Sequence, residues 1–398
     1  MRWRKPLALR RTGKTDRMAQ RTAVQSTTDH TKPGRRRFLL AGLSAGLGGA
    51  ATVAMPQVSR AQTVNWRIQS AWPAKDIFHE FALDYAKRVN DMSSGRLRID
   101  VVAGGSVVPP LQMADAAHAG ILDGCHGNAT LWYKKHKAYA LFGTPPSFGW
   151  DSHSFLAWFY YGGGEALYRQ LTSEIVRVNL TGFLYGPLPT QALGWFKKEI
   201  REPADLKGVR YRGASLSSEM FAELGATIIN VPGNQIAPFM ERGMIDATDG
   251  INVALDLQAG LPEVAKFYMM GSHHRQAEAF EILFNKPKFD ALPAELKAIT
   301  RHAAFSASSD QLWNAHSRFP KEFEEIKKRG VNAVKTGPDV IAAQLKAWDQ
   351  VIAELSKEAF FAKVIKSQMA WVRRTQPFFQ LNNLGSDELA AAYSHFFG

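Results

Sequence analysis

The strongest constraint on the fold is an alternation of strand-like and helix-like segments that occurs twice along the chain. Apolar runs typical of strands, separated by segments with helical spacing, stand at residues 64–72, 97–102 and 122–128. The alternation returns after residue 175, with strand-like runs at 176–185, 193–198, 208–212, 227–231 and 277–285. This pattern predicts an α/β protein of two lobes, with mostly parallel sheets and helices on the sheet faces. We expect a ligand in the cleft between the lobes, near the carboxyl ends of strands.

The last hundred residues lack this alternation. Residues 293–329 and 338–374 are rich in Ala, Leu, Lys and Glu and predict long helices. The second segment has several large apolar side chains that either pack on the chain's own core or form a dimer interface: Trp348, Phe360, Phe361 and Trp371. The sequence leaves these two alternatives open.

Motifs of several catalytic classes are absent from the sequence. No Gly-rich phosphate loop follows a strand, and Gly162, Gly163 and Gly164 lie inside a helical tract, where they predict a break. Cys125 is the single cysteine, and no metal-ligand spacing or nucleophile motif occurs. His273 and His274 are adjacent, so on a strand they would point to opposite faces and could not act as a pair.

The N-terminal segment has the features of a twin-arginine export signal. Arg35-Arg36-Arg37-Phe38-Leu39 precedes an apolar run rich in glycine and alanine at 40–54, and Ser59-Arg60-Ala61 offers small residues for a signal peptidase. The run is short for a membrane anchor, which is the alternative. We therefore expect residues 1–61 to be a signal peptide and the mature protein to work in the periplasm.

The basic character of the chain belongs mainly to this predicted leader. Residues 1–61 contain 13 of the 49 Lys and Arg residues but only two of the 36 acidic residues. The net charge of +13 therefore falls to +2 for residues 62–398. Binding to nucleic acid needs a dense basic surface, so the mature protein is not expected to bind it.

Several polar residues near predicted strand ends are candidates for ligand contacts. Arg212 ends a predicted strand and could hold a carboxylate through two parallel hydrogen bonds, although Arg210 competes for this role. Asp246 and Asp249 flank another short strand, and Asp249 could bind a metal or a ligand or cap a helix. Gln191 lies in a turn before a strand, where an amide is most often an ordinary surface group.

Many short motifs occur in the order found in one family. The chain resembles, over roughly residues 64–380, the DctP-like solute-binding proteins of tripartite ATP-independent periplasmic (TRAP) transporters, in the branch that binds 2-oxo acids and other monocarboxylates. The matching segments are Ser70-Ala71-Trp72-Pro73, Ser94-Gly95-Arg96-Leu97, 105–110, His126-Gly127, Gln191 with Gly194-Trp195-Phe196, Asp205-Leu206-Lys207-Gly208 leading to Arg212, Gly243 with Asp246-Ala247-Thr248, Phe360-Phe361-Ala362-Lys363-Val364 and Ser367-Gln368.

The resemblance implies a two-lobed periplasmic solute-binding protein fold, type II-like, with long C-terminal helices. Lobe I would comprise residues 62–186 and about 275–310, and lobe II residues 187–274. A C-terminal helical region at 311–398 would span both lobes and offer a surface for dimerisation.

The resemblance also implies roles for single residues. Arg212 would pair with the substrate carboxylate, and Gln191, Asn128 and His273 would also contact the substrate. The metal ligands would be Gln191, Asp249 and Gly250, holding Na⁺ or Ca²⁺ against the ligand carboxylate; oxygen ligands of this kind suit these ions. No catalytic residue and no organic cofactor are implied.

At several positions where the branch has aromatic residues, this chain has smaller ones. Asp249-Gly250 stands where the branch has Glu-Trp, Thr130-Leu131 replaces two aromatics, and Ser272 replaces one. Losing aromatic walls enlarges a pocket or makes it more polar, so the sequence predicts a ligand bulkier or more hydroxylated than pyruvate.

The function predicted from these observations is delivery of a small organic acid to a membrane permease, without enzymatic activity. Two alternatives remain at this stage. An exported sensor would have the same fold and present its ligand to a signalling receptor. A periplasmic enzyme acting on a small acid would need a nucleophile and base or a cofactor site, which the sequence does not offer.

Overall fold

The structure, a computed structural model, describes residues 63–213 and 215–398. The predicted signal peptide and its cleavage site lie outside the described residues. Within the described part, no helix combines the length and the apolar character needed to cross a membrane.

The first sheet has five strands in the order β2-β1-β3-β10-β4. β1 pairs in parallel with β2 and β3, whereas β10 is antiparallel to both β3 and β4. Every residue of β10 is buried, because this strand lies between β3 and β4 and its side chains pack into cores on both faces of the sheet. The strands are β1 (Val64–Ser70), β2 (Leu97–Val102), β3 (Gly124–Gly127), β4 (Leu180–Leu188) and β10 (Glu278–Asn285).

The helices that cover this sheet follow from apolar periodicity and from caps. α1 (Ile77–Met92) begins after Asp76, whose carboxylate accepts a 2.8 Å hydrogen bond from the N–H of Phe78. Gly163 has φ +90° and separates two helices, which confirms the predicted break. The other helices on this sheet are α2 (Met113–His118), α3 (Ser152–Tyr161), α4 (Gly164–Gln170) and α9 (Lys286–Asp290).

The second sheet has six strands in the order β11-β9-β5-β8-β6-β7. Its strands are β5 (Gly194–Phe196), β6 (Arg210–Arg212), β7 (Thr227–Ile229), β8 (Ala247–Thr248), β9 (Phe267–Met270) and β11 (Asn332–Lys335). The sequence did not lead us to expect β11, which lies between two long helices. The helices around this sheet are α5 (Leu216–Glu223), α6 (Ile236–Glu241), α7 (Val253–Gln258) and α8 (Leu261–Val264).

Both sheets are mostly parallel, as the sequence predicted, and each contains one antiparallel strand: β10 in the first sheet and β5 in the second. β4 leads from the first sheet towards β5 of the second, and β10 returns from β9 to the first. A strand that leaves and a strand that returns run in opposite directions, so β4 and β10 pair antiparallel. The same holds for β5 and β9 in the second sheet.

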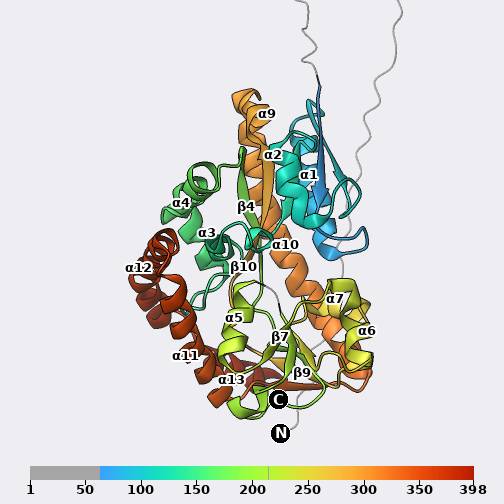
Figure 1. Cartoon of the computed structure of the whole chain (residues 1–398), viewed down its shortest axis with the longest axis vertical. Helices are drawn as coiled ribbons and strands as arrows, with labels where there is room; N and C mark the ends of the chain where they lie inside the picture. Colours follow the sequence, from blue (N-terminus) through green and yellow to red (C-terminus); the bar gives the residue numbers. More distant parts are fainter. Residues whose placement is uncertain (1–62, 214) are drawn as a thin grey trace, which may run out of the picture. The chain divides into compact units, whose positions relative to one another are not determined.

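Three segments join the two sheets: residues 189–193, residues 271–277 and the long helix α10 (Ala294–Lys328). The N–H of Gln191 donates to the carbonyl oxygen of Arg275 at 3.1 Å, which ties the first two segments together. α10 contacts α1 and β4 of the first sheet and α7 of the second (Figure 1). We call the part of the molecule around the first sheet the first half and the part around the second sheet the second half. Apolar residues of α10 contribute to the cores of both halves.

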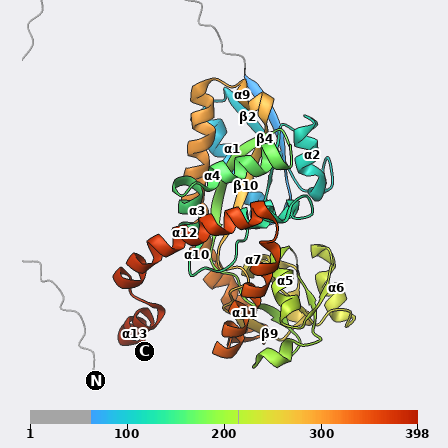
Figure 2. The same ribbon diagram turned by 60° about the vertical axis from the view of Figure 1, so that its left-hand side comes forward.

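The C-terminal helices are α11 (Pro338–Leu355), α12 (Ala359–Asn382) and α13 (Ser386–Phe397). α11 contacts α5 of the second half and α12 contacts α4 of the first (Figure 2). Trp348, Phe360 and Phe361 are buried in the chain's own core. The exposed apolar residues lie further along, in the last turns of α12 and in α13, where residues 377–398 are all exposed.

The described residues also form short 3₁₀ segments and one π-helical turn. The 3₁₀ segments are Pro110–Gln112, Ala129–Trp132, Lys137–Phe142, Pro203–Leu206 and Gly233–Gln235, and a π-helical turn follows α4 at Leu171–Ile175.

Candidate functional site

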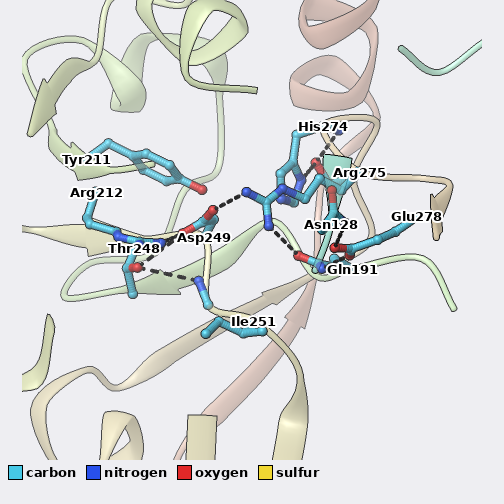
Figure 3. Close-up of polar contacts among 12 residues, drawn as sticks. Asn128, Gln191, Tyr211, Arg212, Thr248, Asp249, Ile251, His274, Arg275 and Glu278 are labelled. Carbon is cyan, nitrogen blue, oxygen red and sulfur yellow. Dashed lines mark hydrogen bonds and ion pairs between the residues drawn. The ribbon is translucent and has the colours of Figure 1, made fainter. Parts of the chain in front are cut away.

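A group of charged and amide side chains lies buried where the segments between the two sheets meet the strand ends (Figure 3). We call it the buried charge cluster and define it as Asn128, Gln191, Arg212, Asp249, Arg275 and Glu278.

Both halves of the molecule contribute to the cluster. Arg212 is the last residue of β6, and Asp249 follows β8, which is parallel to β6 and places Thr248 opposite Arg212. Arg212 and Asp249 therefore meet at the carboxyl ends of these neighbouring strands. Ligands of open α/β sheets generally bind at this end of the strands. The remaining members come from the joining segments and the first sheet: Gln191, Arg275, Glu278 at the start of β10, and Asn128 after β3.

Asp249 is held by two arginines. Its Oδ1 lies 2.9 Å from Nη1 of Arg212, and its Oδ2 lies 3.0 Å from Nη2 of Arg275. The Asp249 side chain is fully buried, and the two arginine side chains are 14% and 11% exposed. Burial opposes ionisation, but the charges of Arg275 and Arg212 outweigh it and keep the pKa of Asp249 below its usual value. The carboxylate is therefore charged at neutral pH.

The two arginines of β6 have different surroundings. Arg210 pairs with Asp246 at 2.6 Å, and their side chains are 43% and 33% exposed. Arg212 instead donates through Nε to the carbonyl oxygen of Val231 at 3.1 Å and joins the buried cluster. Of the two candidates from the sequence, Arg212 is the one that the fold places beside the other predicted site residues.

Arg275 and Glu278 extend the cluster to the first sheet. Nη1 of Arg275 donates to Oε1 of Gln191 at 3.4 Å, and Nε2 of Gln191 donates to the Glu278 carboxylate. Nδ2 of Asn128 donates to Oε1 of Glu278 at 3.0 Å. Burial raises the pKa of Glu278, although Arg275 and Gln191 oppose the increase. Sequence reasoning missed both Arg275 and Glu278; the available signal was the occurrence of charged residues at the start of a mainly apolar run.

His273 is not part of the cluster. Its Nδ1 lies 2.8 Å from Oγ of Ser147, and its backbone N–H donates to Oε1 of Gln344 on α11 at 2.7 Å. His273 and His274 lie in the segment between β9 and β10 rather than on a strand, so the premise of opposite strand faces was wrong. His274 is fully buried, and burial together with the charge of Arg275 lowers its pKa to about 3. It is therefore neutral at physiological pH.

Two of the three predicted cation ligands are brought together, but around a guanidinium group. Asp249 and Gln191 each direct an oxygen towards Arg275 (Figure 3). Gly250 has φ +66°, and a Cβ there would lie 2.6 Å from Oδ2 of Asp256. A side chain at residue 250 would therefore strain the backbone and require the Asp256 side chain to shift. Within residues 63–213 and 215–398, no group of three or more His, Cys, Asp or Glu residues is placed to hold a metal ion.

A cavity of about 590 Å³ is lined by Gly213, the residue that follows Arg212, although Arg212 itself does not line it. Thr130, Leu131 and Tyr133 line it from the first half, and Gly213, Ser215, Ser218 and Ile228 line it from the second. Thr130 and Leu131, which replace two aromatic residues of the related branch, thus line this cavity.

Comparison with known proteins identifies the family. Residues 68–362 match the family model DctP, described as bacterial extracellular solute-binding protein, family 7. The chain belongs to this family. The resemblance inferred from the short motifs is therefore confirmed.

Individual relatives of this DctP-family protein are similar over most of its length. A monocarboxylate 2-oxoacid-binding periplasmic protein of Nostoc sp. is 29% identical over 83% of this chain and 90% of its own length. A TRAP transporter solute-binding protein from Bordetella bronchiseptica is 26% identical with a TM-score of 0.77, covering 84% of this chain and 98% of its own; it forms a mixed-occupancy dimer with calcium and picolinate. A TRAP periplasmic solute-binding protein from Pseudoalteromonas atlantica, with bound sodium and pyruvate, is 28% identical with a TM-score of 0.75, covering 85% and 100%.

These relatives confirm the predicted two-lobed solute-binding fold with a long C-terminal helix. They are periplasmic proteins of transport systems rather than enzymes. Calcium or sodium accompanies a carboxylate ligand in the solved relatives, as the sequence analysis expected for this fold. The roles of single residues and the lobe boundaries in this chain stay predictions.

Proposed function

We propose that this protein is the extracytoplasmic receptor of a TRAP transporter, which binds a small organic acid and delivers it to membrane permease subunits. The observation that carries this proposal is the position of Arg212. Its side chain lies at a strand end and is only 14% exposed, and the next residue, Gly213, lines a cavity to which both halves of the molecule contribute. A carboxylate is the ligand group that an arginine fork fits best.

Binding by this arrangement requires no covalent step. A ligand carboxylate would pair with Arg212 while the rest of the ligand contacts both halves of the cavity. Such a ligand binds the closed arrangement better than an open one and shifts the population towards it. Exclusion of water then strengthens the pairing between the carboxylate and the guanidinium.

The cavity also supports the expectation of a ligand larger or more hydroxylated than pyruvate. Thr130 and Leu131 leave space that aromatic rings would fill, and Ser215 and Ser218 line the same cavity. The hydroxyl oxygens of these serines are buried and have no hydrogen-bond partner among the described residues. A hydroxylated acid would satisfy them once these side chains turn towards the cavity, which an unsubstituted short acid could not do.

The test is calorimetric titration of the purified protein with pyruvate, lactate and larger hydroxylated monocarboxylates. We expect at least one acid to bind, the larger acids to bind more tightly than pyruvate, and Arg212→Ala to weaken binding strongly. Arg210→Ala is the matched control because it removes the same charge from the same strand. Absence of binding by every acid would contradict the function, and tight pyruvate binding without any gain for larger acids would contradict the proposed ligand size.

Export through the twin-arginine pathway is part of the same proposal. Replacing Arg35, Arg36 and Arg37 by lysine should abolish the periplasmic fraction measured by cell fractionation. Undiminished export of the variant would show that another route is used.

A homodimer is the remaining element of the proposal. Its support is the exposed apolar surface of α12 and α13, which includes Phe378, Leu381 and Phe397. Light scattering coupled to size exclusion should report a dimer for the purified protein and a monomer for Phe378→Asp with Leu381→Asp. A monomeric wild-type protein would contradict it.

A further inference from the structure

Arg275 lies between Gln191 and Asp249, two of the three residues for which the sequence predicts cation binding. Its Nη2 contacts Oδ2 of Asp249 at 3.0 Å and its Nη1 contacts Oε1 of Gln191 at 3.4 Å. The side chain is 11% exposed, and its Nε is buried without a hydrogen-bond partner among the described residues. A buried cation of this kind remains only where anions or dipoles surround it, and here they are Asp249, Gln191 and Glu278.

The residues present do not fit an added metal ion. Both carboxylate oxygens of Asp249 already face a guanidinium, one from Arg212 and one from Arg275. The side-chain oxygen of Gln191 also faces Arg275. A Na⁺ or Ca²⁺ ion that used these oxygens would lie against a fixed positive charge of the protein, and like charges at such short range repel strongly when water is excluded.

We propose that the Arg275 guanidinium supplies, from within the chain, the positive charge that calcium or sodium supplies beside the ligand in the solved relatives. Arg275 joins Asp249 to Gln191, and together with Arg212 it presents two guanidinium groups to a ligand carboxylate. This protein therefore binds its organic acid without a metal ion. The inference rests on the proposed function, since it concerns how the same site recognises its ligand.

The charges of the cluster agree with this assignment. Arg212 and Arg275 contribute two positive charges and Asp249 one negative charge. Two guanidinium groups therefore share one aspartate, and a ligand carboxylate supplies a second anion for them. A divalent ion would leave the buried site with a large uncompensated charge.

Two measurements on the purified wild-type protein test the proposal. The first titrates pyruvate and the larger acids in a potassium buffer with EDTA, and again with added calcium or sodium. We expect the dissociation constant to differ by less than about twofold between the buffers. The second measures uptake of radioactive calcium by equilibrium dialysis, with and without pyruvate, and we expect none at this site.

If the proposal holds, the substitution Arg275→Gln should make acid binding depend on a metal ion. The glutamine removes the charge and leaves the oxygens of Asp249 and Gln191 available. We expect acid binding in EDTA to weaken by more than about tenfold, and calcium to restore part of it. Arg210→Gln is the control and should behave as wild type in both buffers. Circular dichroism establishes whether each variant folds, and the wild-type measurements stand if Arg275→Gln does not.

The outcomes separate this inference from the function on which it rests. Failure of every acid to bind in every buffer would contradict the proposed function. Acid binding that requires calcium or sodium, or stoichiometric calcium uptake by the wild-type protein, would leave the function intact and overturn the role of Arg275. Unchanged acid binding by folded Arg275→Gln in EDTA would overturn it as well.

Discussion

Strand β6 carries two arginines, two residues apart, that each pair with an aspartate next to β8. Arg210 and Asp246 form a pair that water reaches from one side, with side chains 43% and 33% exposed. Arg212 and Asp249 form a buried pair, and Asp249 is shared with Arg275. The residue types and the two strands are the same, so the difference comes from burial and from the second arginine that shares Asp249. A solvated pair contributes little to stability, whereas a buried charge that loses its partner is costly.

Asp249→Ala should have the largest effect of any change in this comparison. It leaves Arg212 and Arg275 buried side by side without their shared carboxylate. We expect a loss of about 3–5 kcal/mol in the free energy of unfolding, measured by urea denaturation. Asp246→Ala, its counterpart at the surface, should cost less than about 1 kcal/mol. Equal losses at the two positions would contradict the distinction between the pairs.

Arg212→Ala should weaken the binding of the preferred acid by about 2–5 kcal/mol, because the ligand carboxylate and Asp249 would both lose a buried partner. Calorimetry with the Arg210→Ala protein as reference measures this difference. Binding within about twofold of wild type would remove Arg212 from the site.

Asp256 shows how burial changes the pKa of an aspartate when its hydrogen-bond donor is the neutral Trp195 rather than an arginine. Burial raises its pKa to about 7, although the indole N–H of Trp195 donates to the carboxylate at 2.8 Å. The folded state therefore binds more protons than the unfolded chain between about pH 4 and pH 7, and stability falls as the pH rises. We expect this group alone to reduce the free energy of unfolding by about 2–3 kcal/mol from about pH 5 to about pH 8.

Asp256→Asn should remove that contribution. The measurement is urea denaturation of both proteins across this pH range, with the difference between them plotted against pH. Asp249 provides the contrast: two arginines lower its pKa, so its stabilising contribution is present above about pH 4 and is lost only as the pH falls below that value. A flat difference between wild type and Asp256→Asn would show that the carboxyl is ionised throughout.

The smallest expected effect is the coupling between Arg210 and Asp246. A double-mutant cycle with Arg210→Ala and Asp246→Ala should give less than about 1 kcal/mol and should diminish with added salt. A coupling that is larger and insensitive to salt would mean that this pair is less solvated than its exposure suggests.

The residues predicted from the sequence fall into two groups. Arg212 and Asp249 lie at the ends of short strands, where the order of elements already indicates a site, and the fold places them together. Gln191 and Asn128 also reach the cluster, through Glu278. His273 instead contacts Ser147 and α11, because the segment that carries it is not a strand.

Arg275 could not be recognised in the same way. It lies in an irregular segment without periodicity, and its partners are 84 residues away at Gln191 and 26 residues away at Asp249. Side-chain spacing within a strand or helix gives no information about such contacts. Only the path of residues 271–277 between the two sheets brings Arg275 to them.

The sequence by itself determined the family, the order of the strands and helices apart from β11, and the nearly neutral charge of residues 62–398. These properties depend on local periodicity and on composition. The tertiary structure alone decided the antiparallel return of β10 beside β4 and the cation that Asp249 faces. A buried charge must find its partner across the fold, and that choice is made by packing rather than by any neighbouring residue.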